Sequence, residues 1–156
     1  MGINNGVDPL FVRSIIIDPV TPTTLYAAGI SNLLFKSTDG GANWTQSSIT
    51  TFNFNITRVN ALLIDPNTPA TIYAATNRGV LKSTNAAGTW ASSNSGFPFT
   101  NITVNALALD KTNNLLYAAT SFGLFKSSNA GANWIDINGN LPSFASTLVV
   151  PDPTNS

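Results

Sequence analysis

Residues 18–28 read DPVTPTTLYAA, and residues 65–75 repeat this segment as DPNTPATIYAA. A third, degenerate copy begins at Asp110 and ends with Leu116-Tyr117-Ala118-Ala119. Each copy is followed by a Lys-Ser pair and then by a tryptophan, at positions 44, 90 and 134, so that the spacings are 46 and 44 residues. A fixed period of this length indicates a repeat architecture, in which one repeat cannot bury its apolar face alone and stacks on its neighbours.

The second copy shows how one repeat is organised. Residues 59–64 are a short apolar run that ends at the turn-forming pair Asp65-Pro66, and they predict a buried strand. We expect a second strand over 71–76, a third over 80–83 and a fourth over 90–93. No segment has a capped helical period. Four short antiparallel strands in roughly 45 residues are typical of a propeller blade.

The other two copies predict blades with the same order of strands. In the first copy we expect strands over 12–17, 25–28, 33–36 and 44–47. In the third copy we expect strands over 104–109, 115–120, 123–126 and 134–137. The predicted blades cover roughly 12–48, 59–93 and 104–138. Residues 147–150 look like the first strand of a fourth blade, so the fold class is an all-β array of three four-stranded antiparallel propeller blades and one extra inner strand.

The turns between the third and fourth strands share a pattern. They read STDGGANW over 37–44, STNAAGTW over 83–90 and SSNAGANW over 127–134. The pattern resembles the Asp-box, or BNR repeat, whose form is Ser-x-Asp-x-Gly-x-Thr-Trp. The second and third copies have Asn in place of Asp, and the glycine of the second is displaced by one residue. Three such turns in register, with their flanking segments, cover nearly the whole chain and imply the fold of the Asp-box propellers.

In that family the boxes lie in outer hairpins, away from the ligand face, so the resemblance implies structural roles. A short Asp or Asn side chain accepts hydrogen bonds from nearby backbone N–H groups, and glycine takes the unusual backbone angles. Asn forms these bonds without the charge that strengthens them, and the tryptophan covers the edge of the sheet. The predicted structural residues are Ser37, Asp39, Gly41, Trp44, Ser83, Asn85, Trp90, Ser127, Asn129, Gly131 and Trp134.

Composition excludes several classes of site. Seven acidic and seven basic residues balance, and the chain has no His, Cys or Glu. Disulfides, Cys or His metal sites and His- or Cys-based nucleophile relays are therefore excluded. The chain lacks the basic stripe that would indicate nucleic-acid binding, and no apolar run reaches membrane-spanning length. We predict neither a metal nor another cofactor.

Some members of the family that the chain resembles are enzymes, and the residues that each enzyme needs can be compared with those in the sequence. Asp-box proteins include sialidases, xyloglucan-cleaving glycoside hydrolases, sortilin-like receptors and photosystem assembly factors. A sialidase needs an arginine triad and a nucleophilic Tyr with a Glu beside it, whereas this chain has only Arg13, Arg58 and Arg78 and lacks Glu. A two-carboxylate hydrolase needs a facing pair, but the Asp residues that end equivalent strands belong to turns. We therefore expect no enzymatic activity.

A ligand is expected on the face that carries the turns after the second strands and the linkers between blades. These segments differ between copies, and exposed loops on a rigid frame are the usual place for binding. The candidate ligand residues are Arg78, Phe122, Asn77 and Asn32. Five linker phenylalanines could stack on a sugar or anchor a peptide, but we favour their packing under the linkers to seal the seams between blades. They are Phe52, Phe54, Phe97, Phe99 and Phe144.

Three blades do not close a ring, since known propellers use four or more, and an open array leaves apolar flanks at both ends. Either the chain is a piece of a longer propeller, or it self-assembles, most simply as a two-fold dimer with six blades. We predict a non-catalytic structural or binding module that presents a variable loop face to a protein or glycan. Its expected partners are itself or further blades; the alternative is a non-catalytic portion of a secreted glycoside hydrolase propeller.

Location is suggested by composition alone. Abundant Asn, Thr and Ser with little charge favour a secreted or cell-surface bacterial protein. The first residues lack a basic region followed by an apolar core, so no signal peptide is predicted.

Overall fold

The computed structural model describes residues 12–30, 33–49, 56–141 and 146–150. These residues form three four-stranded antiparallel sheets, each built from strands that follow one another in the chain. The first sheet contains β1 (Val12–Ile17), β2 (Leu25–Gly29), β3 (Leu33–Ser37) and β4 (Thr45–Ser48). The second contains β5 (Val59–Ile64), β6 (Ile72–Thr76), β7 (Gly79–Ser83) and β8 (Ala91–Ser92). The third contains β9 (Val104–Asp110), β10 (Leu115–Thr120), β11 (Gly123–Ser127) and β12 (Ile135–Asp136).

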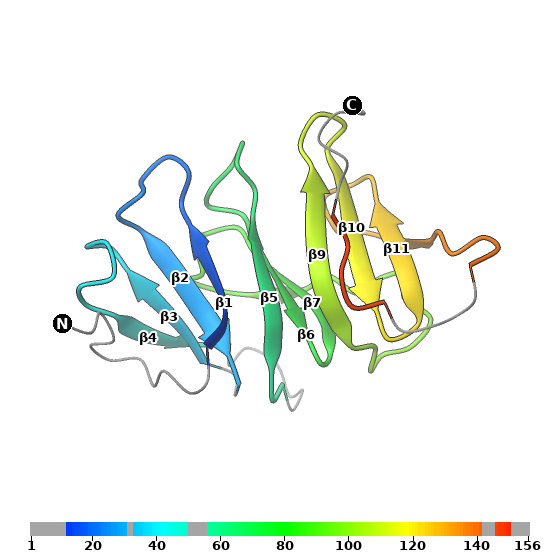
Figure 1. Ribbon diagram of the computed structural model, residues 1–156, viewed down its shortest axis with the longest axis horizontal. Helices are drawn as coiled ribbons and strands as arrows, with labels where there is room; N and C mark the ends of the chain where they lie inside the picture. The colour runs from blue at the N-terminus through cyan, green and yellow to red at the C-terminus, as the bar shows by residue number, and fades with distance from the viewer. Residues whose placement is uncertain (1–11, 31–32, 50–55, 142–145, 151–156) are drawn as a thin grey trace.

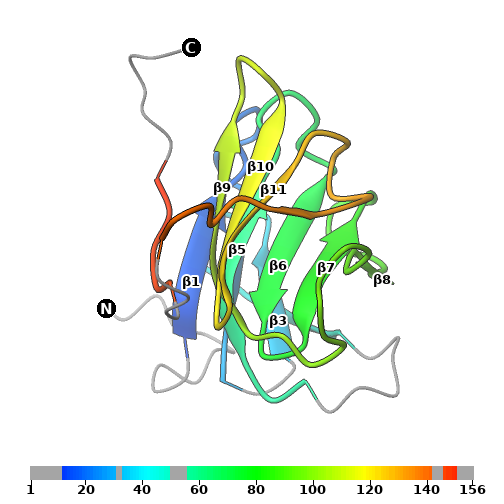
Figure 2. The same ribbon diagram turned by 90° about the vertical axis from the view of Figure 1, so that its right-hand side faces the viewer.

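The sheets lie side by side like the blades of an open fan (Figure 1). Their first strands, β1, β5 and β9, contact each other in that order, and Figure 2 shows them together along one side of the molecule. In the second blade, β7 and β8 lie on the opposite side (Figure 2). The chain is therefore an all-β partial propeller of three blades, and no helix capable of crossing a membrane occurs in its described part.

The strands run over the segments that their sequence pattern predicts, and each end differs by at most one residue. Successive side chains of a strand point to opposite faces, and this alternation explains how the middle blade packs against both neighbours. In β6, Ile72 and Ala74 belong to the apolar cluster shared with the first blade, whereas Tyr73 and Ala75 belong to the cluster shared with the third. All five residues of β6 are buried, and its two alanines allow the neighbouring blades to approach closely.

We call the contact between the first and second blades the first seam, and that between the second and third blades the second seam. The second seam is closed by hydrogen bonds as well as by apolar packing. The Tyr73 hydroxyl and Lys82 Nζ both donate to the backbone oxygen of Ala130, at 3.1 and 2.9 Å. Trp134 Nε1 donates to the backbone oxygen of Ser93 at 2.7 Å, and Ser93 Oγ donates to the Gly131 oxygen at 2.6 Å.

Residues 146–150 differ from the prediction, because the structure assigns no strand to 147–150. The segment nevertheless starts where a following blade would start. Asn105 Nδ2 donates to the Ser146 oxygen at 2.7 Å, just as Asn60 Nδ2 donates to the Val104 oxygen at the start of β9. A strand needs a paired neighbour, and no second strand of a fourth blade is present in the described residues to pair with it.

Candidate functional site

The first serine turn, residues 37–44, is held by its own side chains. We use the name serine turn for this segment and for its equivalents over 83–90 and 127–134. Ser37 Oγ donates to Asp39 Oδ1 at 2.8 Å and accepts the Gly41 N–H at 2.9 Å. Asp39 Oδ1 accepts the Asn43 N–H at 2.9 Å, and Asn43 Nδ2 donates to Asp39 Oδ2 at 2.8 Å. The carboxylate thus fixes the return of the chain toward β4.

The other two serine turns reproduce this network with Asn in place of Asp. Thr89 and Asn133 donate their N–H groups to Asn85 Oδ1 and Asn129 Oδ1, both at 2.8 Å. The serine hydroxyls of these turns, from Ser83 and Ser127, also donate to Asn85 Oδ1 and Asn129 Oδ1, at 3.0 and 2.8 Å. The Asn side-chain oxygens therefore accept the backbone N–H groups as the Asp39 carboxylate does, but without its charge.

The second serine turn places alanine in a backbone conformation that favours glycine. Ala87 has φ 68° at the position where Gly41 has 91° and Gly131 has 81°. Ala87 is also buried, with 4% of its surface exposed, in the first-seam cluster. The glycine of this turn, Gly88, follows one residue later, so burial of the Ala87 methyl group offsets part of the steric cost of the left-handed conformation.

Charge distinguishes the first serine turn from the others. Hydrogen bonds from the Asn43 side chain and backbone, and from Ser37, lower the pKa of Asp39 from 3.8 to about 2. The carboxylate is exposed, so it remains ionised at any physiological pH. The aspartates of the β1–β2, β5–β6 and β9–β10 turns accept backbone N–H groups in the same way, from Val20, Asn67 and Thr112.

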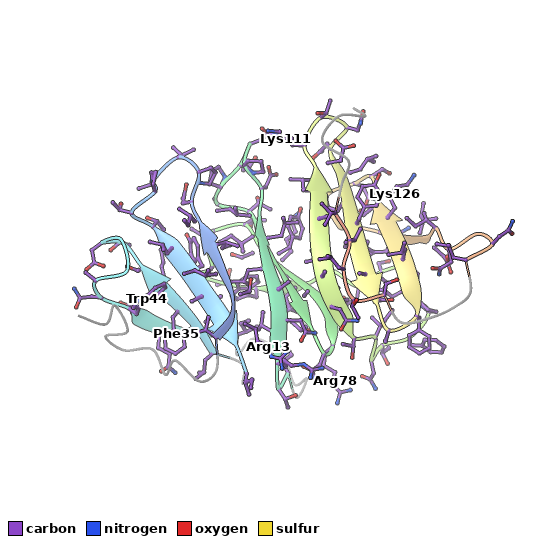
Figure 3. The ribbon with its side chains drawn as sticks, in the orientation of Figure 1. Arg13, Phe35, Trp44, Arg78, Lys111 and Lys126 are labelled. Atoms are coloured by element: carbon purple, nitrogen blue, oxygen red, sulfur yellow. The ribbon has the colours of Figure 1, made fainter. Side chains whose placement is uncertain are left out.

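Figure 3 places Arg78, one of the predicted ligand residues, at the opposite end of the blades from Lys111. Asn77 has a structural role there, because its Oδ1 accepts the N–H groups of Thr57 and Arg58 at 3.0 and 3.3 Å and holds the linker into β5. Arg78 is half-buried. Asn32 lies outside the described residues.

Phe122 pairs with Phe99, which the sequence places among the linker phenylalanines. The two rings have centroids 4.6 Å apart at an interplanar angle of 41°. The exposed fractions of Phe122 and Phe99 are 43% and 53%. This pair is a solvent-exposed aromatic platform on the loop face.

Phe97 behaves as the seam-sealing hypothesis expects. Its ring stacks on Trp134 at 5.2 Å and meets Phe125 edge-on at 5.1 Å, within the second-seam cluster. Phe52, Phe54 and Phe144 lie outside the described residues. The linker phenylalanines therefore divide, with Phe97 sealing a seam and Phe99 remaining exposed.

Two of the three repeat tyrosines, Tyr26 and Tyr73, are buried in the core clusters. Burial, with a smaller contribution from Asp65, raises the pKa of Tyr73 to about 12, and its hydroxyl donates to a backbone oxygen across the second seam. Burial likewise raises the pKa of Tyr26. No group of three Asp side chains that could hold a metal ion occurs in the described ranges.

No protein-family model and no curated protein matches the sequence. Solved structures match the fold. The chain is similar to an ancestral GH74 enzyme, with 21% identity and a TM-score of 0.71 over 85% of this chain and 21% of the other. It is similar to YCF48 bound to D1 peptide, with 15% identity and a TM-score of 0.63 over 80% of this chain and 40% of the other. It also matches the extracellular domain of a putative one-component system from B. thetaiotaomicron, with 22% identity, a TM-score of 0.64, and 93% and 19% coverage.

These likenesses support the propeller fold. The chain spans about a fifth of the GH74 enzyme and two fifths of YCF48. The neighbours thus include both an enzyme and a peptide-bound protein, so fold alone does not select between these functions.

Proposed function

We propose that this chain is a non-catalytic section of a β-propeller that completes a ring with further blades and presents its loop face to a protein or glycan. The face of the first blade that points away from the second blade carries this proposal, and we call it the free flank. Ile15 and Ile17 are 54% and 55% exposed on β1. Their counterparts on β5 are Leu62, which is 7% exposed, and Ile64, and both pack against the first blade.

The side of β1 that faces the second blade is already used, since Ile16 packs on the first-seam cluster. Ile15 and Ile17 therefore point to the other face of the strand. Phe35 and Trp44 lie at the same end of the molecule, on the side of the first blade that is away from the second and third blades (Figure 3). An apolar flank of this kind suits another blade, whether from a longer chain or from a second copy.

The mass of the native protein tests self-assembly. A two-fold dimer has a mass of 2 × 16.4, or 32.8, kDa. We expect sedimentation equilibrium to give this dimer, and Ile15→Ser with Ile17→Ser to shift it toward monomer. Ile135→Ser is the matched control, because Ile135 is 56% exposed on the outer strand β12 rather than on the free flank. A strict monomer that unfolds cooperatively would contradict self-assembly.

The loop face is the proposed binding surface because it combines exposed aromatic rings with segments that differ between the repeats. Aromatic rings exposed on a rigid frame can stack on sugar rings or anchor a peptide. A glycan array and a peptide display screen should return ligands whose binding is lost in Phe122→Ala and kept in Ile135→Ser. Ligands that bind both variants equally would place recognition elsewhere.

We further propose that the serine turns are Asp-boxes, which the shared hydrogen-bond network supports, and that the protein acts outside the cell, as one structural neighbour does. The alternative function is a non-catalytic portion of a secreted glycoside hydrolase propeller, which the likeness to a GH74 enzyme supports. Reading the parent gene for additional blades and for carboxylates at their loop face distinguishes the two.

A further inference from the structure

The first seam contains a cavity of about 450 Å³ between the first and second serine turns. Lys36, Asp39, Asn43 and Asn85 line it with polar groups, and Leu34 and Ala86 contribute apolar surface. The volume lies within the range of small-molecule sites, roughly 300–1,000 Å³. The cavity is formed at the serine-turn end of the blades, so it is separate from the loop face that carries Arg78 and Phe122.

The second seam shows what the corresponding residues do when the seam is closed. Lys82 Nζ lies 5.5 Å from the centre of the Tyr73 ring and donates across the seam to the Ala130 oxygen. Lys36 Nζ lies 5.3 Å from the centre of the Tyr26 ring, in the same arrangement. In the described part of the chain, however, Lys36 donates no hydrogen bond to the second serine turn. Its ammonium group is therefore available to a ligand in the cavity.

A second donor of the first seam, the Trp90 indole, is also without an acceptor in the described part of the chain. Trp134 Nε1 is paired with the Ser93 oxygen, but its counterpart Trp90 Nε1 is buried and has no partner among the described residues. Trp90 is 4% exposed and belongs to the same apolar cluster as Leu34 and Ala87, which line the cavity. Buried donors without acceptors are uncommon, and an oxygen atom that enters the seam can satisfy one.

The charges in the cavity indicate which ligand it accepts. One ammonium group and one carboxylate line it, and three hydrogen bonds keep the Asp39 carboxylate ionised. An anion that approaches Lys36 meets the repulsion of Asp39, and a cation that approaches Asp39 meets the repulsion of Lys36. A neutral ligand with many hydroxyl groups avoids both penalties, and it offers acceptors to Lys36 and donors to Asp39.

We propose that this cavity binds a neutral saccharide. The C–H face of a sugar ring suits the apolar surface of Leu34 and Ala86, while its hydroxyl groups hydrogen-bond with Lys36, Asp39 and the amides of Asn43 and Asn85. The inference does not depend on ring closure or on the loop face.

Titration of the full chain with cellobiose and lactose, followed by NMR chemical shifts, tests the proposal. Glucuronate and glucosamine serve as acidic and basic probes of similar chemistry. We expect the two neutral disaccharides to shift the signals of the first and second serine turns, with weaker effects from the charged probes. Thr38→Trp, which fills the cavity from an exposed lining position, should weaken disaccharide binding at least tenfold.

Matched variants test whether the sugar occupies this cavity. Thr84→Trp changes the same position of the second serine turn and should leave binding unchanged. Lys36→Met should weaken binding about tenfold through loss of a charged hydrogen-bond donor, whereas Lys82→Met should affect only stability. Melting curves verify that each variant folds.

Three results would overturn the proposal. The first is that neither neutral disaccharide binds the wild-type chain. The second is that Thr84→Trp weakens binding as much as Thr38→Trp. The third is that Phe122→Ala abolishes binding, because the sugar would then occupy the loop face.

Discussion

The two seams join blades of nearly the same sequence pattern, yet among the described residues the lysine and tryptophan side chains donate hydrogen bonds across the second seam alone. There, Tyr73, Lys82 and Trp134 all donate to backbone oxygens across the seam. At the first seam, Lys36 and Trp90 repeat these residue types, but Trp90 Nε1 has no acceptor in the described residues and a cavity separates the turns. The repeated residues therefore specify each blade, while the spacing between blades sets what their polar groups do.

The largest expected effect comes from removing the tryptophan that completes the second seam. Trp134 is 1% exposed, stacks on Phe97 and donates to the Ser93 oxygen. We expect Trp134→Ala to lower the free energy of unfolding by about 3–5 kcal/mol, because it leaves a large cavity and an unpaired carbonyl group. Urea denaturation measures this loss. Trp90→Ala should cost less, and an equal or larger loss there would contradict the difference between the seams.

Close packing at the second seam predicts the next effect. A Cβ atom added at Gly131, where φ is 81°, would lie 2.6 Å from Ser93 Oγ. Gly131→Ala should therefore cost about 2 kcal/mol or more, from the left-handed backbone and the displaced Ser93 bond together. The matched variant is Gly40→Ala, where φ is 71° and nothing lies within 4 Å, so that only the backbone cost of about 1 kcal/mol applies. Equal losses in thermal denaturation would show that the Ser93 contact is unimportant.

A tryptophan-to-phenylalanine pair isolates the indole hydrogen bond. Trp134→Phe should lose about 1–2 kcal/mol of stability, because the Ser93 oxygen loses its donor. Trp90→Phe removes a buried donor that already lacks an acceptor in the described residues, so its cost should be smaller by about 1 kcal/mol. Both variants lose the same ring volume, and chemical denaturation compares them directly. If Trp90→Phe proves as destabilising as Trp134→Phe, the indole of Trp90 is paired in solution.

The smallest expected effect concerns acid stability of the first serine turn. The pKa of Asp39 is lowered on folding, so its contribution to stability is complete above about pH 4 and is lost as the pH falls through about 2. Asp39→Asn should keep the turn, as Asn85 and Asn129 do, and make the melting temperature less dependent on pH between 4 and 2. Asp110→Asn is a positive control. Hydrogen bonds from Asn113 also lower the pKa of Asp110, so this variant should likewise make the melting temperature less dependent on pH. Parallel pH profiles for wild type and Asp39→Asn would contradict this role of the carboxylate.

The strands were predictable because their signals are local. Alternating apolar residues, Asp-Pro turns and serine turns recur with the repeat, and each strand end follows within one residue. Residues 147–150 carry the same local signal as the first strands, but a strand also requires a hydrogen-bonded neighbour. The structure therefore differs from the prediction where the sequence pattern is correct and the pairing partner is missing from the described residues.

The roles of the candidate ligand residues were less predictable, because these roles depend on contacts between segments far apart in the sequence. Asn77 looks like an exposed turn residue, yet its side chain holds the linker at Thr57 and Arg58. Phe99 looks like a seam residue similar to Phe97, yet it lies exposed beside Phe122. Both phenylalanines lie in the linker over 94–103, and no signal in its sequence distinguishes them.

Three four-stranded blades, their strand boundaries and the serine turns follow from the sequence alone, because period-two alternation and turn chemistry act within one repeat. The different roles of the paired Lys and Trp residues emerge only in the folded chain. Lys82 and Trp134 donate across the second seam, whereas Lys36 lines a cavity in the first seam and Trp90 Nε1 has no acceptor among the described residues. Each of these Lys and Trp residues has the same repeat position as its counterpart. Hydrogen bonding requires donor and acceptor to come within about 3 Å of each other, and that distance is set by the packing of neighbouring blades.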